Sequence, residues 1–215
     1  MFVVIFEVQP KPERWDDYLD TAKLLRPELE RIDGFVDNER FKSERQEGRV
    51  LSLSTWRDEK ALIRWRTQAT HHVEGQTRGR SEIFQDYHLR VGEVTEDSAA
   101  PQDRTIVGDR FDTTEVGAAT VVTLTEFGPI DADVSTLRPP ADDTPGLVAW
   151  EWFSSLTEPG KRVLLVSWSD EQAATRCAPA APGEHGTFRH RRVRVIRDYG
   201  MRDRREAPQY FPDVV

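Results

Sequence analysis

Apolar runs alternate with amphipathic stretches in the first part of the chain. Residues 2–8 form an apolar run that only Glu7 interrupts, which predicts a strand. Apolar positions within 12–32 recur with the i, i+3, i+4 spacing of an amphipathic helix. Residues 35–43 and 49–56 are rich in β-forming side chains and flank a glycine-containing turn, which predicts a hairpin.

Two further elements complete this pattern. Asp58 is placed to cap a second helix that runs to about Ala69, and residues 83–94 predict a last strand. Pro27 is expected to kink the first helix, and Gly34 to follow its end. The expected order is β-α-β-β-α-β, the order of a ferredoxin-like unit.

The same pattern occurs twice in the chain. The segment 34–61 matches 146–173 without a gap at 11 of 28 positions, where ordinary residue frequencies give about two. Arg90 matches Arg194 at an offset of 104, which implies a deletion of eight residues in the second copy. The chain is therefore a tandem duplication.

The second repeat keeps the strands and loses most of the helices. Residues 118–127 predict its first strand, whereas 131–145 contain three prolines and cannot form a five-turn helix. The second helix is expected to shorten to about 170–177. The predicted parts of the chain are a first repeat over 1–94, a linker over 95–116, a degenerate repeat over 117–201 and a C-terminal tail over 202–215.

Composition and charge narrow the class of partner. The chain of 215 residues is 37% hydrophobic and 32% charged, with a formal net charge of −8. This acidic balance disfavours nucleic acid and anionic membranes as partners. No apolar run is long enough to span a bilayer, and the N-terminus lacks a basic signal region. The single cysteine, Cys177, excludes an internal disulfide and fits a cytoplasmic location.

Motifs throughout the first repeat carry a resemblance to a known family. They are Phe6-Glu7-Val8, Leu25–Leu29, Ile32–Phe35, Glu39–Phe41, Leu51–Glu59, Trp65-Arg66, His71 and Phe84–Val91. They resemble the antibiotic biosynthesis monooxygenase superfamily, and the resemblance returns in 146–171 and 195–201. It implies an α+β fold in which two ferredoxin-like sheets pack face to face as a dimeric-type α/β barrel. We expect the two repeats to build this barrel within one chain, because each sheet needs cover on the face that its helices leave open. Two separate units that each pair with another chain are the alternative.

Glu7 is the first candidate site residue. Period-two alternation places it on the face of Val3 and Ile5, in a sheet whose two faces are both expected to be buried. A carboxylate there either lines a pocket as an acid or base with a raised pKa, or pairs with a cross-strand arginine such as Arg90. The sequence leaves both alternatives open.

Trp65, His71 and His72 lie where the second helix is expected to end. An unbroken helix brings His72 back to the face of Trp65 and turns His71 about 120° away, whereas the family pattern favours His71. A kink near Thr70 would bring His71 to the face of Trp65 and so reconcile helix geometry with the family pattern. Alternatively, both histidines are exposed to solvent at the end of the helix and have no functional role. Heme-degrading relatives use a strand-one residue, a Trp and a His at or near Glu7, Trp65 and His71. Here, however, a glutamate replaces their asparagine and the Trp-to-His spacing is shorter.

The remaining candidates are substrate-binding residues. They are Asn38, Phe41, Ser52 and Ser54 along the hairpin, together with Arg90. Cys177 aligns with Trp65 in the second repeat, so we expect one functional pocket per chain. Phosphate-loop, Rossmann and hydrolase motifs are absent from the sequence, and paired cysteine ligands for a metal are excluded.

Three functional hypotheses follow from the resemblance. The first is a monooxygenase that oxidises a small phenol- or quinol-like substrate in an apolar pocket without metal or flavin, with Glu7 or His71 as base and Trp65 against the ring. The second is heme binding or degradation, with His71 or His72 as axial ligand. The third is a non-catalytic barrel that binds a ligand or partner. On each hypothesis, two such chains could still pair into a homodimer through the outer faces of the barrel.

Overall fold

The computed structural model describes residues 1–102, 106–108, 110–128, 138–177, 179 and 187–208. The first repeat contains β1 (Phe2–Pro10), η1 (Pro12–Arg14), α1 (Trp15–Glu30), β2 (Phe35–Ser43), β3 (Val50–Trp56), α2 (Glu59–Thr67), η2 (His71–Thr77), η3 (Gly79–Ile83) and β4 (Phe84–Asp97). The second contains β5 (Val121–Phe127), β6 (Leu147–Ser155), β7 (Arg162–Trp168), α3 (Glu171–Arg176) and β8 (Phe188–Gly200).

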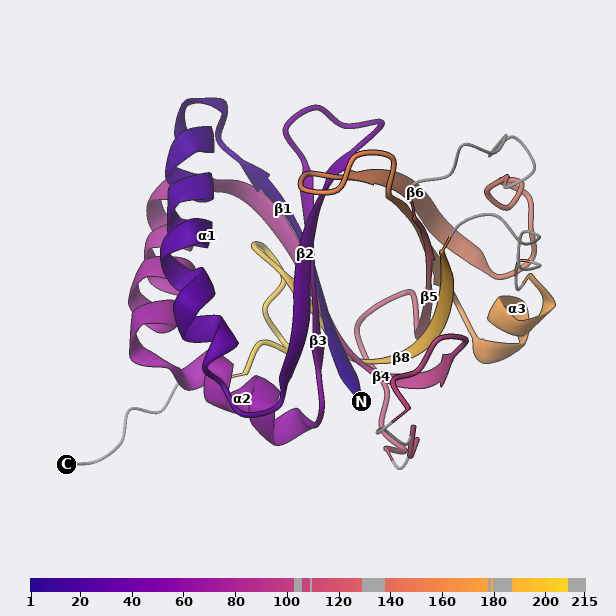
Figure 1. Cartoon of the computed structure of the whole chain (residues 1–215). Helices are drawn as coiled ribbons and strands as arrows, with labels where there is room; N and C mark the ends of the chain where they lie inside the picture. The colour runs from indigo at the N-terminus through magenta and orange to yellow at the C-terminus, as the bar shows by residue number, and fades with distance from the viewer. Residues whose placement is uncertain (103–105, 109, 129–137, 178, 180–186, 209–215) are drawn as a thin grey trace.

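The strands close into one barrel in the order β1-β3-β2-β6-β7-β5-β8-β4. Each repeat supplies four neighbouring strands, and the two sheets join where β2 meets β6 and where β4 meets β8. Figure 1 shows the helical layer of the first repeat covering one side of the barrel, with the shorter α3 on the far side. The expected intramolecular barrel is thus confirmed, and no second copy is needed to close it.

The expected elements are confirmed with small shifts at their ends. The first helix begins at Trp15 after the short turn η1, and Asp58 caps α2 by accepting a hydrogen bond from the Ala61 backbone at 2.8 Å. The sequence did not indicate η2 and η3, two π-helical segments that fill the region between α2 and β4. Residues 138–145 are not helical, as expected, and 131–137 lie outside the described residues. In the described ranges, no helix has both the length and the hydrophobicity that crossing a bilayer requires.

Glycine–alanine contacts explain part of the internal repeat. Gly34 and Gly146 adopt φ values of +93° and +85°, which favour glycine. A Cβ atom at Gly34 would come 2.6 Å from the Cβ of Ala61, and one at Gly146 would come 2.4 Å from the Cβ of Ala173. Each repeated glycine therefore lets the hairpin pack closely on the following helix.

Replacing Gly34 with alanine is expected to lower the free energy of unfolding by about 3 kcal/mol, because left-handed strain and an overpacked contact add. The control is Gly108→Ala, since Gly108 also has a positive φ, +61°, but a Cβ there meets no atom within 4 Å. Urea unfolding should show a loss about 2 kcal/mol larger for Gly34→Ala than for the control. Equal losses would mean that backbone strain alone is responsible.

Candidate functional site

A cavity of about 260 Å³ lies between the outer face of the first sheet and the helical layer of the same repeat. Its sheet wall comes from β1 to β4, its helical walls come from α1, α2, η2 and η3, and β8 and the segment after it complete the lining. The apolar lining includes Val4, Phe6, Leu25, Leu62 and Leu89. A concave, mostly apolar site with a few polar groups is the usual form of a small-molecule pocket.

Strand alternation decides which predicted residues reach this cavity. Asn38 and Ser54 are paired neighbours in the register, and together with Ser52 they line the cavity on the outer face. The Asn38 amide nitrogen donates to Ser52 Oγ and to the Leu53 carbonyl oxygen, each at 3.1 Å. Three of the four hairpin candidates therefore lie at one site.

Phe41, Arg90 and Glu7 lie on the opposite face, inside the barrel. Phe41 is fully buried in the apolar core of the barrel, and Arg90 is 2% exposed. None of the three contributes to the lining of the cavity. Their expected roles in substrate binding and catalysis at this cavity are corrected accordingly.

Trp65 and His71 form a stacked pair in the cavity wall. Their ring centroids are 4.1 Å apart and the rings are nearly parallel, at 16°. His71 Nδ1 lies 3.0 Å from the Trp65 carbonyl oxygen, which can only accept. The Gln76 amide nitrogen lies farther from Nδ1, at 3.3 Å. The closer contact, with the carbonyl oxygen, favours a neutral ring with its proton on Nδ1 and the basic lone pair on Nε2.

Burial controls the charge of His71. It lowers the pKa of the imidazole to about 4, against a partial compensation from the hydrogen bond to the Trp65 carbonyl oxygen. His71 is consequently uncharged at neutral pH. Gly75 packs against the ring edge, since a Cβ there would come 2.8 Å from His71 Cδ2.

The end of α2 explains why His71, not His72, lines the cavity. The helix stops at Thr67, Gln68 is extended with ψ 129°, and helical structure resumes at residue 69 and continues into η2. The Gln68 side-chain oxygen accepts from the His71 backbone nitrogen at 2.6 Å. The ideal-helix argument for His72 assumed an unbroken helix, and the break lies two residues before the expected kink.

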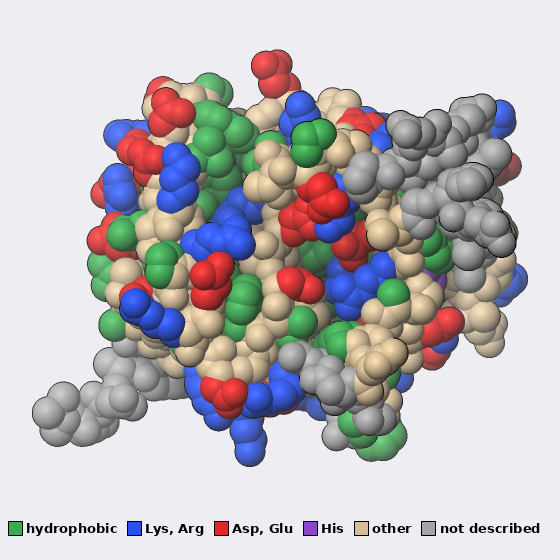
Figure 2. All heavy atoms as spheres, in the orientation of Figure 1, with side chains coloured by type: hydrophobic (Ala, Val, Ile, Leu, Met, Phe, Trp, Pro, Cys, Tyr) green, Lys and Arg blue, Asp and Glu red, His purple; other side chains and the backbone are tan. Residues whose placement is uncertain are grey.

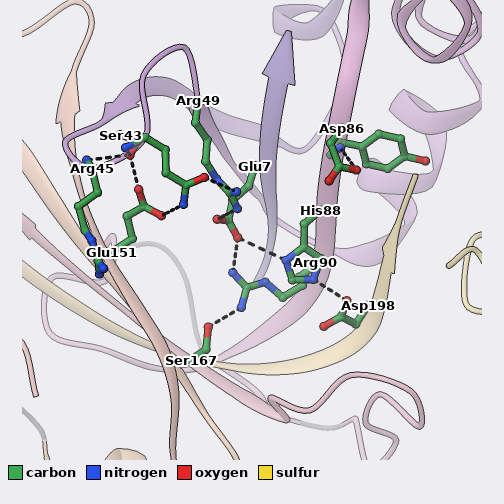
Figure 3. Close-up of polar contacts among 12 residues, drawn as sticks. Glu7, Ser43, Arg45, Arg49, Asp86, His88, Arg90, Glu151, Ser167 and Asp198 are labelled. Atoms are coloured by element: carbon green, nitrogen blue, oxygen red, sulfur yellow. Dashed lines mark hydrogen bonds and ion pairs between the residues drawn. The ribbon is translucent and has the colours of Figure 1, made fainter. Parts of the chain in front are cut away.

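Glu7 belongs to a polar network inside the barrel (Figure 3). Its carboxylate accepts from Arg90 at 2.6 Å and from Arg49 at 2.7 Å, and His88 Nδ1 lies 3.5 Å away. Arg90 also donates to Ser167 Oγ of the second repeat at 2.7 Å. The network thus ties the two sheets together across the barrel.

The surroundings of Glu7 lower the pKa of its carboxyl group and do not raise it. Burial alone would raise the pKa, but Arg90, the hydrogen bond from His88 and Arg49 together hold it well below its usual range. The expectation of an acid or base with a raised pKa is therefore wrong. The alternative of a carboxylate paired with Arg90 is the one that the contacts support.

The second repeat contains an equivalent arginine–glutamate network inside the barrel. Its position corrects the alignment between the last strands of the two repeats. Arg90 is opposite Ile5, whereas Arg191 is opposite Leu124 at the equivalent place in the second sheet. Arg191 bonds to Glu126 and donates to Thr55 Oγ1 of the first repeat at 3.0 Å. Arg90 therefore corresponds to Arg191, not Arg194, and the deletion in the second copy is longer than the sequence match implied.

Several lining residues were not among the candidates. Tyr18, Arg40, Gln76, Arg80, Tyr87, Tyr199 and Arg204 all line the cavity. No element was predicted between about Ala69 and residue 83, where Gln76 and Arg80 lie, and the last two residues come from the far end of the chain. Tyr87 and Tyr199 lay within motifs of the family resemblance, which was the available signal.

The fold defines a two-repeat protein that closes a ferredoxin-like α/β barrel within one chain, and comparisons with known proteins identify its family. The antibiotic biosynthesis monooxygenase family model matches residues 1–78. A protein of Pyricularia oryzae named jasmonate monooxygenase ABM is 43% identical over 221 residues, which cover 99% of this chain and 99% of that protein. The chain belongs to the antibiotic biosynthesis monooxygenase family.

Solved structures support the fold at low sequence identity. The complex of an aldoxime dehydratase with butyraldoxime has a TM-score of 0.57 and 9% identity, with 91% of this chain and 79% of that chain covered. Another aldoxime dehydratase has a TM-score of 0.55 and 12% identity, with 90% and 80% covered. At such identities the likeness concerns the arrangement of the chain alone.

Proposed function

We propose that this protein is a monooxygenase that inserts one oxygen atom of O2 into a small, largely apolar organic acid of the jasmonate type. The proposal rests first on the cavity, which combines an apolar floor with arginines such as Arg40 and Arg80. Basic side chains are also visible between the helical layer and the barrel in Figure 2. The second support is the full-length relative whose name gives jasmonate as its substrate.

The side chains of the cavity have distinct parts in this proposal. Apolar strand residues such as Val4, Phe6 and Leu89 exclude water from the reacting carbon. Asn38 and Ser52 offer polar groups for an oxygen function of the substrate. His71, uncharged and with Nε2 unprotonated, is available to accept a proton.

A phenol- or quinol-like substrate is the second candidate, and the His71–Trp65 pair favours it. The uncharged imidazole can accept a hydrogen bond from a phenol hydroxyl and take its proton as the phenol loses an electron, and the Trp65 ring can pack on the ring plane. Such a substrate supplies its own electrons for O2 reduction, so the reaction needs neither metal nor flavin. An alkyl acid instead needs two electrons from an external donor to reduce the second oxygen atom to water.

Heme ligation is the least suited to the surroundings of His71. One ring face stacks on Trp65, Nδ1 faces a carbonyl oxygen, and the Cδ2 edge lies against Gly75. Ligation through Nε2 would also need room for the whole macrocycle beside this nitrogen, and the cavity measures about 260 Å³. We therefore propose a reaction that does not depend on heme, and a hemin titration tests this.

The substrate test is an oxygen-uptake assay of the purified protein with isotopically labelled O2. Jasmonate is expected to gain one labelled oxygen atom when a reductant is supplied, and a hydroquinone panel without reductant, in chelator-treated buffer, tests the second candidate. Val4→Trp, which would fill the floor of the cavity, should abolish turnover, whereas Val148→Trp at an exposed site of the second repeat should not. Absence of turnover under every condition would instead support the non-catalytic barrel.

A further inference from the structure

The chain after β8 leaves the second repeat and enters the cavity of the first. In Figure 1 this yellow segment lies between the helical layer and the barrel. The Met201 backbone nitrogen donates to the Tyr87 carbonyl oxygen at 3.1 Å, and the Gly200 nitrogen to the Asp203 carbonyl oxygen at 2.7 Å. Tyr199 and Arg204 thereby become part of the cavity lining.

Glu206 holds this segment in place. Its carboxylate accepts from Thr114 Oγ1 at 2.8 Å and from the backbone nitrogens of Glu115 and Asp198, each at 2.6 Å. These donors belong to the segment before β5 and to β8. The position of the turn that carries Arg204 is therefore fixed by contacts outside the cavity.

Arg204 and Arg80 meet two tyrosines at one corner of the cavity. Arg204 donates a hydrogen bond to the Tyr87 hydroxyl, and its guanidinium lies 5.9 Å from the centroid of the Tyr199 ring. Arg80 comes from η3 and lines the same cavity. Three separate parts of the chain, namely η3, β4 and the end of β8 with the segment after it, thus converge on this corner.

The corner has an excess of positive charge. Burial and the neighbouring Arg204 lower the pKa of Arg80, and no carboxylate of the described residues is among the groups that shift it. Burial, with Tyr87 beside it, raises the pKa of Tyr199 to about 12, so this phenol stays protonated. The acidic residue among the described lining is Glu59, which is bonded to Arg110.

We propose that Arg80 and Arg204, with the hydroxyls of Tyr87 and Tyr199, form an anion subsite that binds the carboxylate of the substrate. Guanidinium groups suit carboxylates because they donate two parallel charge-assisted hydrogen bonds, and phenol hydroxyls add further donors. This inference rests on the proposed function and specifies which end of the substrate binds where. It also gives the degenerate second repeat a role, because its terminal segment supplies part of the subsite.

The subsite implies an orientation for the apolar part of the ligand. Tyr199 packs against the same buried cluster as Phe6 and Leu89, and Trp65 packs against a second cluster that Val4 and Leu89 also contact. Leu89 is common to both clusters. A ligand anchored at Arg204 therefore extends over Leu89 towards Trp65 and the adjacent His71.

The test compares an acid with its neutral ester. Octanoate and methyl octanoate are titrated into the intact protein by calorimetry, and Arg204→Gln is compared with Arg205→Gln. Arg205 is the matched control, because it is the next residue on the same exposed turn, pairs with Asp203 and does not line the cavity. We expect the wild type to prefer octanoate at least tenfold, Arg204→Gln to lose this preference by weakening acid binding alone, and Arg205→Gln to keep it.

Equal binding of acid and ester by the wild type would overturn the proposal, as would an equal weakening of both by Arg204→Gln. Arg80→Gln supplies a second variant from a different element, so a folding defect in one variant leaves the test intact. Octanoate binding requires no turnover. If the oxygen-uptake assay showed no monooxygenase activity, these titrations would therefore still decide whether the anion subsite exists.

Discussion

Replacing Glu7 with alanine is expected to lower the free energy of unfolding by about 3–5 kcal/mol, because it removes one partner of a buried ion pair. Arg90 is 2% exposed and would keep its charge with Ser167 as a neutral partner. Arg49 would lose its contact with the same carboxylate. Most of the expected cost is the burial of an uncompensated guanidinium.

Urea unfolding of three variants separates charge from packing. Glu7→Gln keeps the size of the side chain and removes the charge, so it should reproduce most of the loss. Glu30→Ala is the surface control, since Glu30 pairs with Arg26 at 2.7 Å on an exposed part of α1, and it should cost less than about 1 kcal/mol. If Glu7→Gln were as stable as the wild type yet inactive, Glu7 would instead have a catalytic role.

The contribution of Glu7 to the free energy of unfolding should decrease at acidic pH. The folded-state pKa lies below the value of about 4.3 expected for an unfolded glutamate. A carboxyl group whose pKa is lowered by folding stabilises the folded state at any pH above its pKa in the unfolded chain. This stabilisation is lost as the pH falls below that unfolded-state pKa. The difference in stability between wild type and Glu7→Gln should therefore shrink as the pH falls below about 4.

The sequence predicted the architecture because the repeat preserved the residues that define it. The match between 34–61 and 146–173 kept the glycine–alanine contacts and both helix caps, Asp58 and Asp170. Such local determinants are readable in a single chain. The intramolecular barrel then followed from the need to cover two half-buried sheets.

The site was harder to predict, because periodicity separates two faces but does not say which face has the cavity. Glu7 was correctly placed with Ile5, yet that face points into the barrel. Asn38 and Phe41 lie three positions apart on one strand, so they point to opposite sides. Arg204 reaches the cavity only through the tertiary path of the last segment, which no local pattern records.

Replacing His71 with alanine is expected to reduce kcat of the proposed oxidation about 100-fold, because a positioned general base contributes at least that much. The control is His72→Ala, since His72 is adjacent in sequence but does not line the cavity. Gly75→Ala should cause a smaller loss by displacing the ring that lies 2.8 Å from the added Cβ. Unchanged kcat in His71→Ala would reduce the Trp65–His71 pair to a packing role.

The pH dependence of the same variant tests the cause of its effect. Because burial lowers the pKa of His71 to about 4, the acid limb of the wild-type kcat/KM profile should lie near pH 4, not near the ordinary histidine value of about 6.5. Between these two values the unfolded chain binds a proton that the folded chain does not, so the folded state loses up to about 3 kcal/mol as the pH falls. His71→Ala removes the group that takes up this proton, so the variant should lose less stability than the wild type over that pH interval. The titration of Glu7 affects the stability of both proteins equally. The variant should therefore be less active but more resistant to acid, and a loss of acid resistance would contradict the buried, neutral imidazole.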